Sequence, residues 1–467
     1  MSASWLTRLV DQRRRIAILI AIAAVSAGIA TLPSSTGDQR AMMGLAVVVA
    51  TVSLFATGVV HGLVISAVFF VLALSSATAP VGVLLSGLWA NATLLIFGGL
   101  IIGAAAERSG LGRYVARGLL RHFLRSYPLM LLGILIGAGA LSFLIPSTTA
   151  RLAITLPIVI GLAKEAGYET GSSGYAAAIL TAVAGNFFTA YGVLPANLVN
   201  LIAHGAAEQL YGRQVGYFEH LLLYAPVLTI AKGATFLGLI LVLFRAPAPV
   251  PIPGGDRLPM GRDARRLAIL LGFTVLLWAT DFIHGLKPGW IALGAGLLCL
   301  LPPIALGHAR EALDQHRLNA VLSVPAALGM ASVLTHSGAG DLISSTVLGL
   351  VQLEGRSAAF GFTTIAVTTS VVSLLATTVG TVAIITPLLG TVGAATGLPI
   401  KAGLAAEMVG LQCLFFHYES VPVMVGIALG GVAPAVAARL LVPLAITGLI
   451  VVMPLLLLWL TLLGVVP

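Results

Sequence analysis

The chain has 467 residues, of which 58% are hydrophobic and only 9% are charged. Soluble domains carry roughly 25% charged residues, so this composition excludes a water-soluble globule and predicts an all-α polytopic membrane protein. The net charge of +9 does not indicate nucleic-acid binding, because the arginines cluster in short segments between apolar stretches, where membrane proteins carry topology signals. Cys299 and Cys413 both lie in apolar runs, so we expect neither a disulfide framework nor a metal cluster.

Apolar segments predict the membrane crossings in chain order. The first follows Arg13, Arg14 and Arg15, and we interpret it as a helix rather than a cleaved signal. About eleven crossings are expected, near residues 16–33, 41–57, 59–77, 88–106, 174–203, 218–244, 266–284, 290–306, 318–336, 402–432 and 439–463. Two further segments, 128–167 and 360–398, are each about twice the length of one crossing and turn at a polar cluster midway. They predict two re-entrant hairpins.

Three segments are rich in arginine: the N-terminus, 107–126 and 245–266. By the positive-inside rule all three face the cytoplasm, which predicts a multi-pass protein of a bacterial-type inner membrane with a cytoplasmic N-terminus. Arg113, Arg117 and Arg121 recur every four residues. This spacing predicts an interfacial helix over 110–125 whose cations meet anionic headgroups.

The second half of the chain repeats the first. Three blocks recur in the same order at offsets of 228, 230 and 227, pairing 107–119 with 335–347, 145–158 with 375–388, and 188–199 with 415–426. The first block continues into arginines and its copy mainly into acidic residues, so the same element is expected to face opposite sides. This predicts an inverted repeat, with an N-terminal helix at 1–40, a first repeat at 41–244, a cytoplasmic linker at 245–266 and a second repeat at 267–467.

Both predicted hairpins turn at hydroxyl clusters. The first contains Ser147, Thr148 and Thr149, and the second contains Thr377 and Thr378, with Thr381 one turn further on. The second helix of each hairpin begins at the tip, so its free N–H groups and positive dipole end point towards the bilayer centre, where an anion can bind. Hydroxyls that merely cap the turn are the alternative. Their duplication at matching positions favours a substrate site.

Downstream of each hairpin a long apolar segment is interrupted, by Gly192 to Pro195 in one repeat and by Glu419 to Pro422 in the other. Proline breaks a helix, and the exposed carbonyls can coordinate a cation beside each tip. We therefore expect Pro195, Asn197, Ser420 and Pro422 beside the substrate, and possible Na⁺ near the two tips. The candidate ion-coupling residues are Ser147, Thr148, Gly192, Thr378 and Glu419.

Three ionisable residues lie in apolar surroundings, which favours a functional role. Arg151, one turn past the first tip, is a candidate to hold an anionic substrate. Glu419 is a candidate to carry a coupled proton or to pair with Arg151, and a purely structural ion pair is the alternative. Lys232 is expected to snorkel or to pair structurally. His417 and Tyr418 flank the second break, where site lining and ordinary packing are equally expected.

These segments resemble the divalent anion/sodium symporter family of the ion transporter superfamily. Residues 94–120 are similar to its fourth helix and amphipathic extension, 141–158 and 374–388 to its two Ser-Asn-Thr hairpins, and 191–199 to its Gly-Thr-Pro-Pro-Asn segment. The resemblance implies an elevator-type carrier, a homodimer, for dicarboxylates, citrate or sulfate. In register, Ser147 and Thr149 match the first motif, Thr377 matches the second, and Pro195, Ala196 and Asn197 match the last segment.

This sequence differs from the family pattern at the two hairpin asparagines, which contact sodium and substrate in that family. Thr148 and Thr378 stand at those positions, and Val379 stands at the last threonine of the second motif. Sodium symport, proton symport and exchange therefore remain open.

The leading hypothesis is a secondary active transporter of a small anion without a cofactor. The alternative is a Na⁺/H⁺ type cation antiporter of the same superfamily in which Glu419 carries the ion. A distant alternative is an intramembrane enzyme or an assembly factor, but the histidines are scattered along the chain. The sequence contains no GxxxxGK[ST] loop, which disfavours a primary pump.

Overall fold

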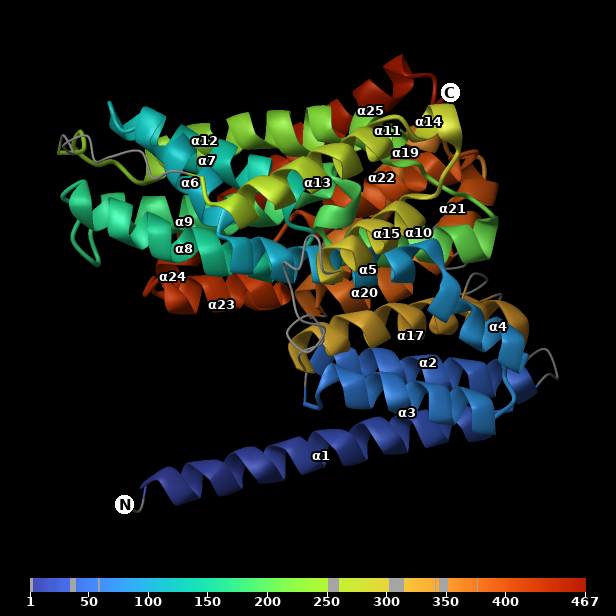
Figure 1. Cartoon of the computed structure of the whole chain (residues 1–467). Helices are drawn as coiled ribbons and strands as arrows, with labels where there is room; N and C mark the ends of the chain where they lie inside the picture. Colours follow the sequence, from blue (N-terminus) through green and yellow to red (C-terminus); the bar gives the residue numbers. More distant parts are fainter. Residues whose placement is uncertain are drawn as a thin grey trace.

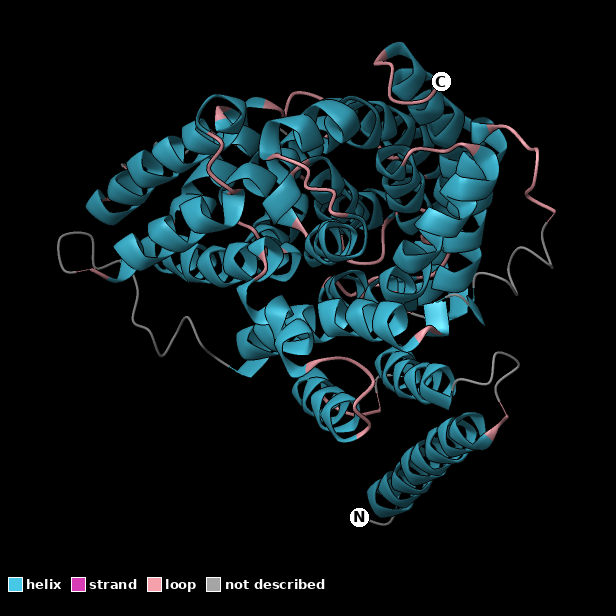
Figure 2. Cartoon of the chain, turned by 90° about the vertical axis from the view of Figure 1, so that its right-hand side faces the viewer, coloured by secondary structure: helices cyan, strands magenta, loops and turns pink. Residues whose placement is uncertain are grey.

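The computed structural model describes residues 3–33, 39–57, 59–250, 260–301, 315–340, 342–343, 352–375 and 377–467. Every regular element in these ranges is helical, which confirms the all-α prediction. The N-terminal elements are α1 (Ala3–Thr31), α2 (Gln39–Thr57), α3 (Gly62–Ser75), α4 (Val81–Ser86), η1 (Gly87–Trp89), α5 (Asn91–Ser109) and α6 (Leu111–His122). Helix α1 contacts α2 and lies at the outer edge of the bundle (Figures 1 and 2).

Helix α5 runs through the middle of the molecule against α15 (Pro288–Leu300), and small residues bring the two backbones together. A Cβ atom added at Gly98 would lie 2.2 Å from the carbonyl oxygen of Ala292, and one added at Gly296 would lie 2.9 Å from that of Gly98. Small residues at such contacts are how membrane helices gain packing energy in the absence of a hydrophobic driving force.

At each predicted hairpin the structure has a pair of helices that turn within a few residues, and that the pairs are re-entrant stays a prediction. The first consists of α7 (Tyr127–Leu144) and α8 (Thr148–Glu165), and the second of α19 (Ala358–Leu375), α20 (Thr378–Ile385), η5 (Thr386–Leu388) and α21 (Leu389–Thr396). Pro157 is accommodated inside α8, whereas Pro387 at the matching position falls in the 3₁₀ turn that divides α20 from α21.

Both predicted helix breaks are confirmed. In the first half, α9 (Ser173–Phe188) is followed by two short 3₁₀ turns, η2 (Thr189–Gly192) and η3 (Leu194–Ala196), before α10 (Leu198–Tyr211) begins. In the second half, α22 (Ile400–Leu411) ends before η6 (His417–Glu419), and α23 (Val421–Leu429) follows. This second break is longer than the prolines alone predict, because the helix already ends at Leu411.

The next element in each half is a helix with a π segment. These are α11 (Tyr217–Tyr224), η4 (Ala225–Ala231) and α12 (Lys232–Leu243), and then α24 (Pro434–Thr447), η7 (Gly448–Val452) and α25 (Met453–Leu462). Pro226 lies within η4 and Pro454 is the second residue after η7, and a missing proline N–H favours such a local change of hydrogen bonding. Both halves therefore contain a hairpin, a broken helix and a π-interrupted helix in the same order.

Before its hairpin, the second half contains α13 (Arg262–Ala279), which begins at the end of the linker, α14 (Asp281–His284), α15 and α17 (Gln315–Ser337). Five helical stretches of the described residues are long and apolar enough to cross a membrane: Val81–Ser109, Tyr127–Leu144, Tyr217–Leu243, Thr378–Thr396 and Pro434–Leu462. Shorter apolar helices accompany them, at Arg15–Thr31, Gln39–Phe55, Gly62–Ser75, Pro288–Leu300, Val321–Ser337 and Ala358–Leu374. Two of the five long stretches are arms of the hairpins, and the count of eleven crossings stays a prediction.

Each hairpin packs against the broken helix of the other half. Helix α10 contacts α20 and α22, while α23 contacts α8 and α9. Tyrosine hydroxyls link the halves: Tyr211 donates to the carbonyl of Thr386 at 3.0 Å, and Tyr175 donates to that of Gly430 at 3.1 Å. The hairpins and broken helices of the two halves are therefore interlocked.

Candidate functional site

The hydroxyl at the start of each returning helix is an N-cap. Ser147 Oγ accepts a hydrogen bond from the N–H of Ala150 at 3.3 Å, and Thr377 Oγ1 accepts one from the N–H of Gly380 at 3.4 Å. Thr381 Oγ1 donates back to the carbonyl of Thr377 at 3.1 Å. Thr149 is exposed and Thr378 is buried. Capping thus uses one hydroxyl per tip, and the first turn of each helix still has N–H groups without an intrahelical partner.

Arg151 is fully buried and binds protein oxygens from three segments. Nη1 donates to the carbonyl of Ile145 at the first tip at 2.7 Å and to that of Ala196 in the first break at 2.9 Å. Nη2 donates to Thr148 Oγ1 at 3.1 Å and to the carbonyl of Asn186 in α9 at 3.0 Å. Four of its five N–H groups are therefore occupied, and the fifth, at Nε, is buried without a partner.

These contacts make the guanidinium a cation held mainly by main-chain oxygens. Asn186 lies in the last turn of α9, whose carbonyl end is the negative pole of the helix. No carboxylate among the described residues bonds to Arg151, so its positive charge is balanced only by these dipoles. The side chain ties tip, break and helix end together.

Asparagines organise the rest of the first break. Asn197 Oδ1 caps α10 by accepting from the N–H of Val199 at 2.9 Å. Asn200 Nδ2 donates to the carbonyls of Ala190 at 3.0 Å and Val193 at 3.2 Å. Pro195 is buried in η3 beside them. Asn200 was not predicted, although an amide inside an apolar helix is the signal that singles it out.

Gly192 ends the first 3₁₀ turn where η4 passes closest. A Cβ atom there would lie 2.2 Å from Thr229 Oγ1 and 3.0 Å from the Cα of Ala225. The glycine is therefore required by the close approach of η4 rather than by a special backbone angle.

In the second break, Glu419 stands at the position that aligns with Gly192, and its carboxylate is buried. Glu419 Oε1 accepts from the N–H groups of Phe415 at 2.9 Å and Phe416 at 2.7 Å, and Oε2 accepts from Ser373 Oγ of α19 at 3.0 Å. Glu419 and Arg151 thus have separate partners, and within the described chain each stabilises its own break. Ser420 precedes α23 and Pro422 lies in its first turn.

Three more buried polar residues near the breaks were not predicted to take part. Gln412 Nε2 donates to the carbonyls of Phe188 at 2.9 Å and Leu228 at 3.1 Å, which joins the ends of α22 and α9. Glu407 in α22 accepts from the hydroxyl of Thr386 at 2.9 Å. Asn186 Nδ2 donates to Thr155 Oγ1 at 3.1 Å. Glu407 and Asn186 are polar residues inside apolar helices, the same signal as Asn200, and Gln412 directly follows such a helix.

The remaining predicted residues lie near the second break. Lys232 is fully buried at the start of α12, with Nζ 3.4 Å from the carbonyl of Leu444. Tyr418 is exposed and donates to the carbonyl of Leu374 at 3.2 Å, whereas His417 is half-buried. Cys299 and Cys413 are both buried free thiols.

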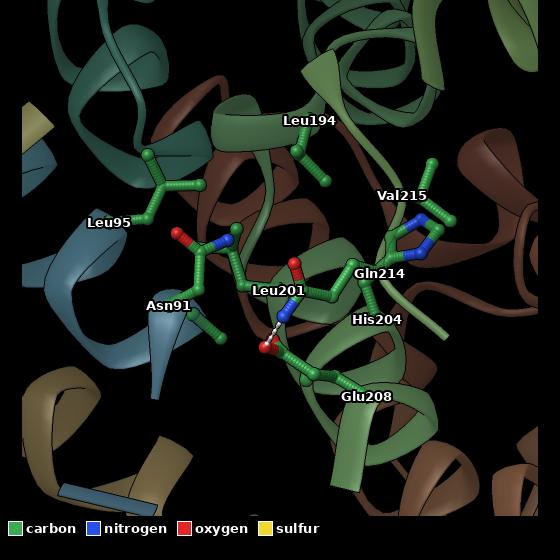
Figure 3. Close-up of a pocket in the computed structure, with 10 residues that line it drawn as sticks. Asn91, Leu95, Leu194, Leu201, His204, Glu208, Gln214 and Val215 are labelled. Carbon is green, nitrogen blue, oxygen red and sulfur yellow. Dashed lines mark hydrogen bonds between the residues drawn. The ribbon is translucent and has the colours of Figure 1, made fainter. Parts of the chain in front are cut away.

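A pocket lies next to the first break. Its walls come from α5, Leu194 of η3, α10 and the loop before α11, and Figure 3 shows Asn91, His204, Glu208 and Gln214 around it. Gln214 donates to Glu208, and Lys287 pairs with the same carboxylate at 3.3 Å.

Paired hairpins and broken helices with buried charges, in a chain of apolar helices, define a membrane transporter of the broken-helix class. The chain belongs to the family described as sodium:sulfate symporter transmembrane region, which matches residues 13–466. That family is one of membrane transporters rather than enzymes, as the resemblance implies, and the apolar helices of this chain fit a multi-pass membrane protein.

Individual relatives are distant. A "Membrane protein" of Cupriavidus necator is 24% identical over 303 residues, 63% of this chain and 59% of that protein. The "Sodium-dependent dicarboxylate transporter SdcS" of Staphylococcus aureus is 24% identical over 238 residues, 45% of each chain. The chain thus matches only about half the length of these relatives. The crystal structure of the Alcanivorax borkumensis YdaH transporter matches the fold with a TM-score of 0.55 at 18% identity, over 79% of this chain and 85% of that one.

Proposed function

We propose that this protein is a secondary active transporter that moves a small anion, a dicarboxylate, citrate, sulfate or a similar ion, across the inner membrane. The observation that carries the proposal is the buried Arg151 at the first hairpin tip, whose charge has no carboxylate partner among the described residues. The name of the staphylococcal relative, a sodium-dependent dicarboxylate transporter, supports the same substrate class.

The electrostatics of both tips favour an anion between them. Helices α8 and α20 begin at the tips, so their free N–H groups and positive poles add to the charge of Arg151. The negative charge of Glu419 is fixed by three donors in the second break. A bound anion would compensate Arg151, with the tip hydroxyls of Ser147, Thr149 and Thr377 as candidate donors.

The same contacts decide which coupling we propose. Main-chain carbonyls at a tip and a break are the ligands that a sodium ion takes in broken-helix transporters. At the first tip these carbonyls, from Ile145, Asn186 and Ala196, are bound by Arg151. We infer that Arg151 acts there as a tethered cation, so any sodium site is confined to the second tip, near Thr378. Exchange or proton coupling then becomes the expected driving mode.

The resemblance also implies movement of the two hairpins as one body in a homodimer, and we propose this elevator mechanism here. The interlocked packing of α10 on α20 and of α23 on α8 supports it, because the hairpin of each half moves with the broken helix of the other. A cation antiporter based on Glu419 has less support, because three donors hold that carboxylate in place.

Uptake into proteoliposomes tests the proposal. Labelled succinate, citrate and sulfate are supplied outside, in sodium or choline buffer, with and without the same unlabelled anion inside. We expect one of these anions to enter, faster with internal anion, and equally well in choline. Lack of uptake of all three would refute anion transport. Uptake that requires sodium in the wild type but not in Arg151→Lys would refute the interpretation of Arg151 as a tethered cation.

A further inference from the structure

Two buried histidines form a hydrogen-bonded pair between the pocket of Figure 3 and the first break. His204 of α10 and His220 of α11 lie 3.0 Å apart, Nε2 to Nδ1. His220 Nε2 lies 2.9 Å from the carbonyl oxygen of Tyr191, in the first break. His204 is 8% exposed and lines the pocket, and its Nδ1 is buried without a partner.

These contacts determine the tautomers of the neutral pair. A carbonyl can only accept, so His220 Nε2 must carry a hydrogen and donate it to Tyr191. His220 Nδ1 is then the acceptor of the pair, so His204 Nε2 carries the second hydrogen. His204 Nδ1 is left as a bare lone pair. The pair has one vacant proton position, and it belongs to the residue that lines the pocket.

The pocket lies at one end of a predicted membrane crossing. Its lining includes Gln214 and Val215 of the loop before α11. The span Tyr217–Leu243 leads from this loop towards the basic segment 245–266. The two ends of a crossing lie on opposite faces, so the pocket lies towards the face opposite that segment, which is the periplasmic side if the segment is cytoplasmic.

Other titratable groups near the pair are mostly engaged. Glu208 is bound by Lys287 and Gln214, and Glu219 of α11 pairs with Lys401 of α22. Asp281 of α14 accepts from the N–H of Tyr217, and Glu407 accepts from Thr386. The phenol rings of Tyr191, Tyr217 and Tyr224 complete the surroundings, and the ring of Tyr224 lies 4.5 Å from that of His220. The imidazole pair holds an acceptor without a partner, His204 Nδ1, on a residue that lines the pocket.

We propose that His204 and His220 form the proton-binding site of this transporter, filled from the pocket at His204 Nδ1. A proton from water in the pocket binds there, and the hydrogen on His204 Nε2 passes to His220 Nδ1. His220 is then an imidazolium that donates more strongly to the carbonyl of Tyr191. The positive charge thus reaches the backbone of the first break.

The effect of this proton on transport rests on the proposed function, anion transport. A positive charge at the first break favours an anion at the adjacent tip, and by linkage a bound anion favours the proton to the same extent. The two would therefore move together, as in symport.

Nitrogen NMR of ¹⁵N-histidine-labelled protein in lipid nanodiscs tests the site without any transport. With single His→Gln variants for assignment, we expect both residues as the Nε2–H tautomer at alkaline pH, and one added proton shared by the pair on acidification. A Nδ1–H tautomer at either residue, or no protonation before the protein unfolds, would overturn the proposal. His220→Gln keeps a donor to Tyr191 and an acceptor for His204, so it preserves the packing while ending the transfer.

Succinate, citrate and sulfate uptake under an inward proton gradient tests the coupling. We expect the gradient to stimulate wild-type uptake and the stimulation to fall at least about fivefold in His204→Gln and His220→Gln, the lower end of typical coupling. The exposed His336, which lies on α17, supplies the control variant His336→Gln. Full stimulation of uptake in both His204→Gln and His220→Gln would overturn the proposal. Loss of the stimulation only in Glu419→Gln or Glu407→Gln would overturn it as well. Absence of any uptake would instead refute the proposed function, and the NMR result would stand separately.

Discussion

Replacing Arg151 by alanine tests the interpretation of the first hairpin tip most directly. The change removes four hydrogen bonds and leaves three main-chain carbonyls, of Ile145, Asn186 and Ala196, in a dry interior. Each buried acceptor left unpaired costs about 1–3 kcal/mol. The expected loss of stability is therefore at least ~3 kcal/mol, about a hundredfold in the unfolding equilibrium.

The same reasoning predicts a chemical rescue. A guanidinium ion fits the space that the Arg151→Ala change opens and can donate to the same carbonyls, and a small metal cation such as Na⁺ can bind them directly. Millimolar guanidinium or Na⁺ should therefore raise the apparent melting temperature of Arg151→Ala by mass action. The wild-type protein, whose site is filled, should show no such increase.

Thermal unfolding in detergent, in choline, sodium or guanidinium chloride, measures both effects. Arg439→Ala is the matched control, because Arg439 is exposed and donates to one carbonyl, that of Leu243, at 3.1 Å. Arg151→Ala with wild-type stability would contradict the cost derived above. An equal response of wild type, Arg151→Ala and Arg439→Ala to the cations would contradict the tethered-cation interpretation.

Three further changes test the breaks. Glu419→Gln keeps an oxygen for the N–H groups of Phe415 and Phe416 but removes the charge that strengthens these bonds, and a loss of about 1 kcal/mol is expected in thermal unfolding; unchanged stability would show that the charge contributes little. Gly192→Ala should lower the yield of folded protein in size-exclusion chromatography, since its Cβ would lie 2.2 Å from Thr229 Oγ1. Adding Thr229→Ala should restore part of that yield, and no coupling between the two changes would argue against the clash. Gln412→Ala removes two bonds to main-chain carbonyls and should cost about 1–3 kcal/mol in the same unfolding assay, whereas a neutral effect would mean that water replaces the amide.

The sequence by itself predicted the elements whose cause is local. Prolines and hydroxyl caps end and begin helices within a few residues, so the hairpin turns before Thr148 and Thr378 and the interruptions after α9 and α22 were predictable. The repeated order of these elements follows from the matching blocks. The π segments and the early end of α22 at Leu411 were not predicted, because they depend on how neighbouring helices pack.

Only the tertiary structure decided what the buried polar side chains bind. Arg151 takes ligands from positions 6, 35 and 45 residues away, and His204 meets His220 across two helices. The sequence alone indicated that Arg151 is costly to bury. It did not predict that main-chain carbonyls rather than a carboxylate would bind it. The reason is physical: composition and periodicity report whether a group leaves water, whereas its partner depends on which distant backbone groups the fold leaves unpaired at the same depth.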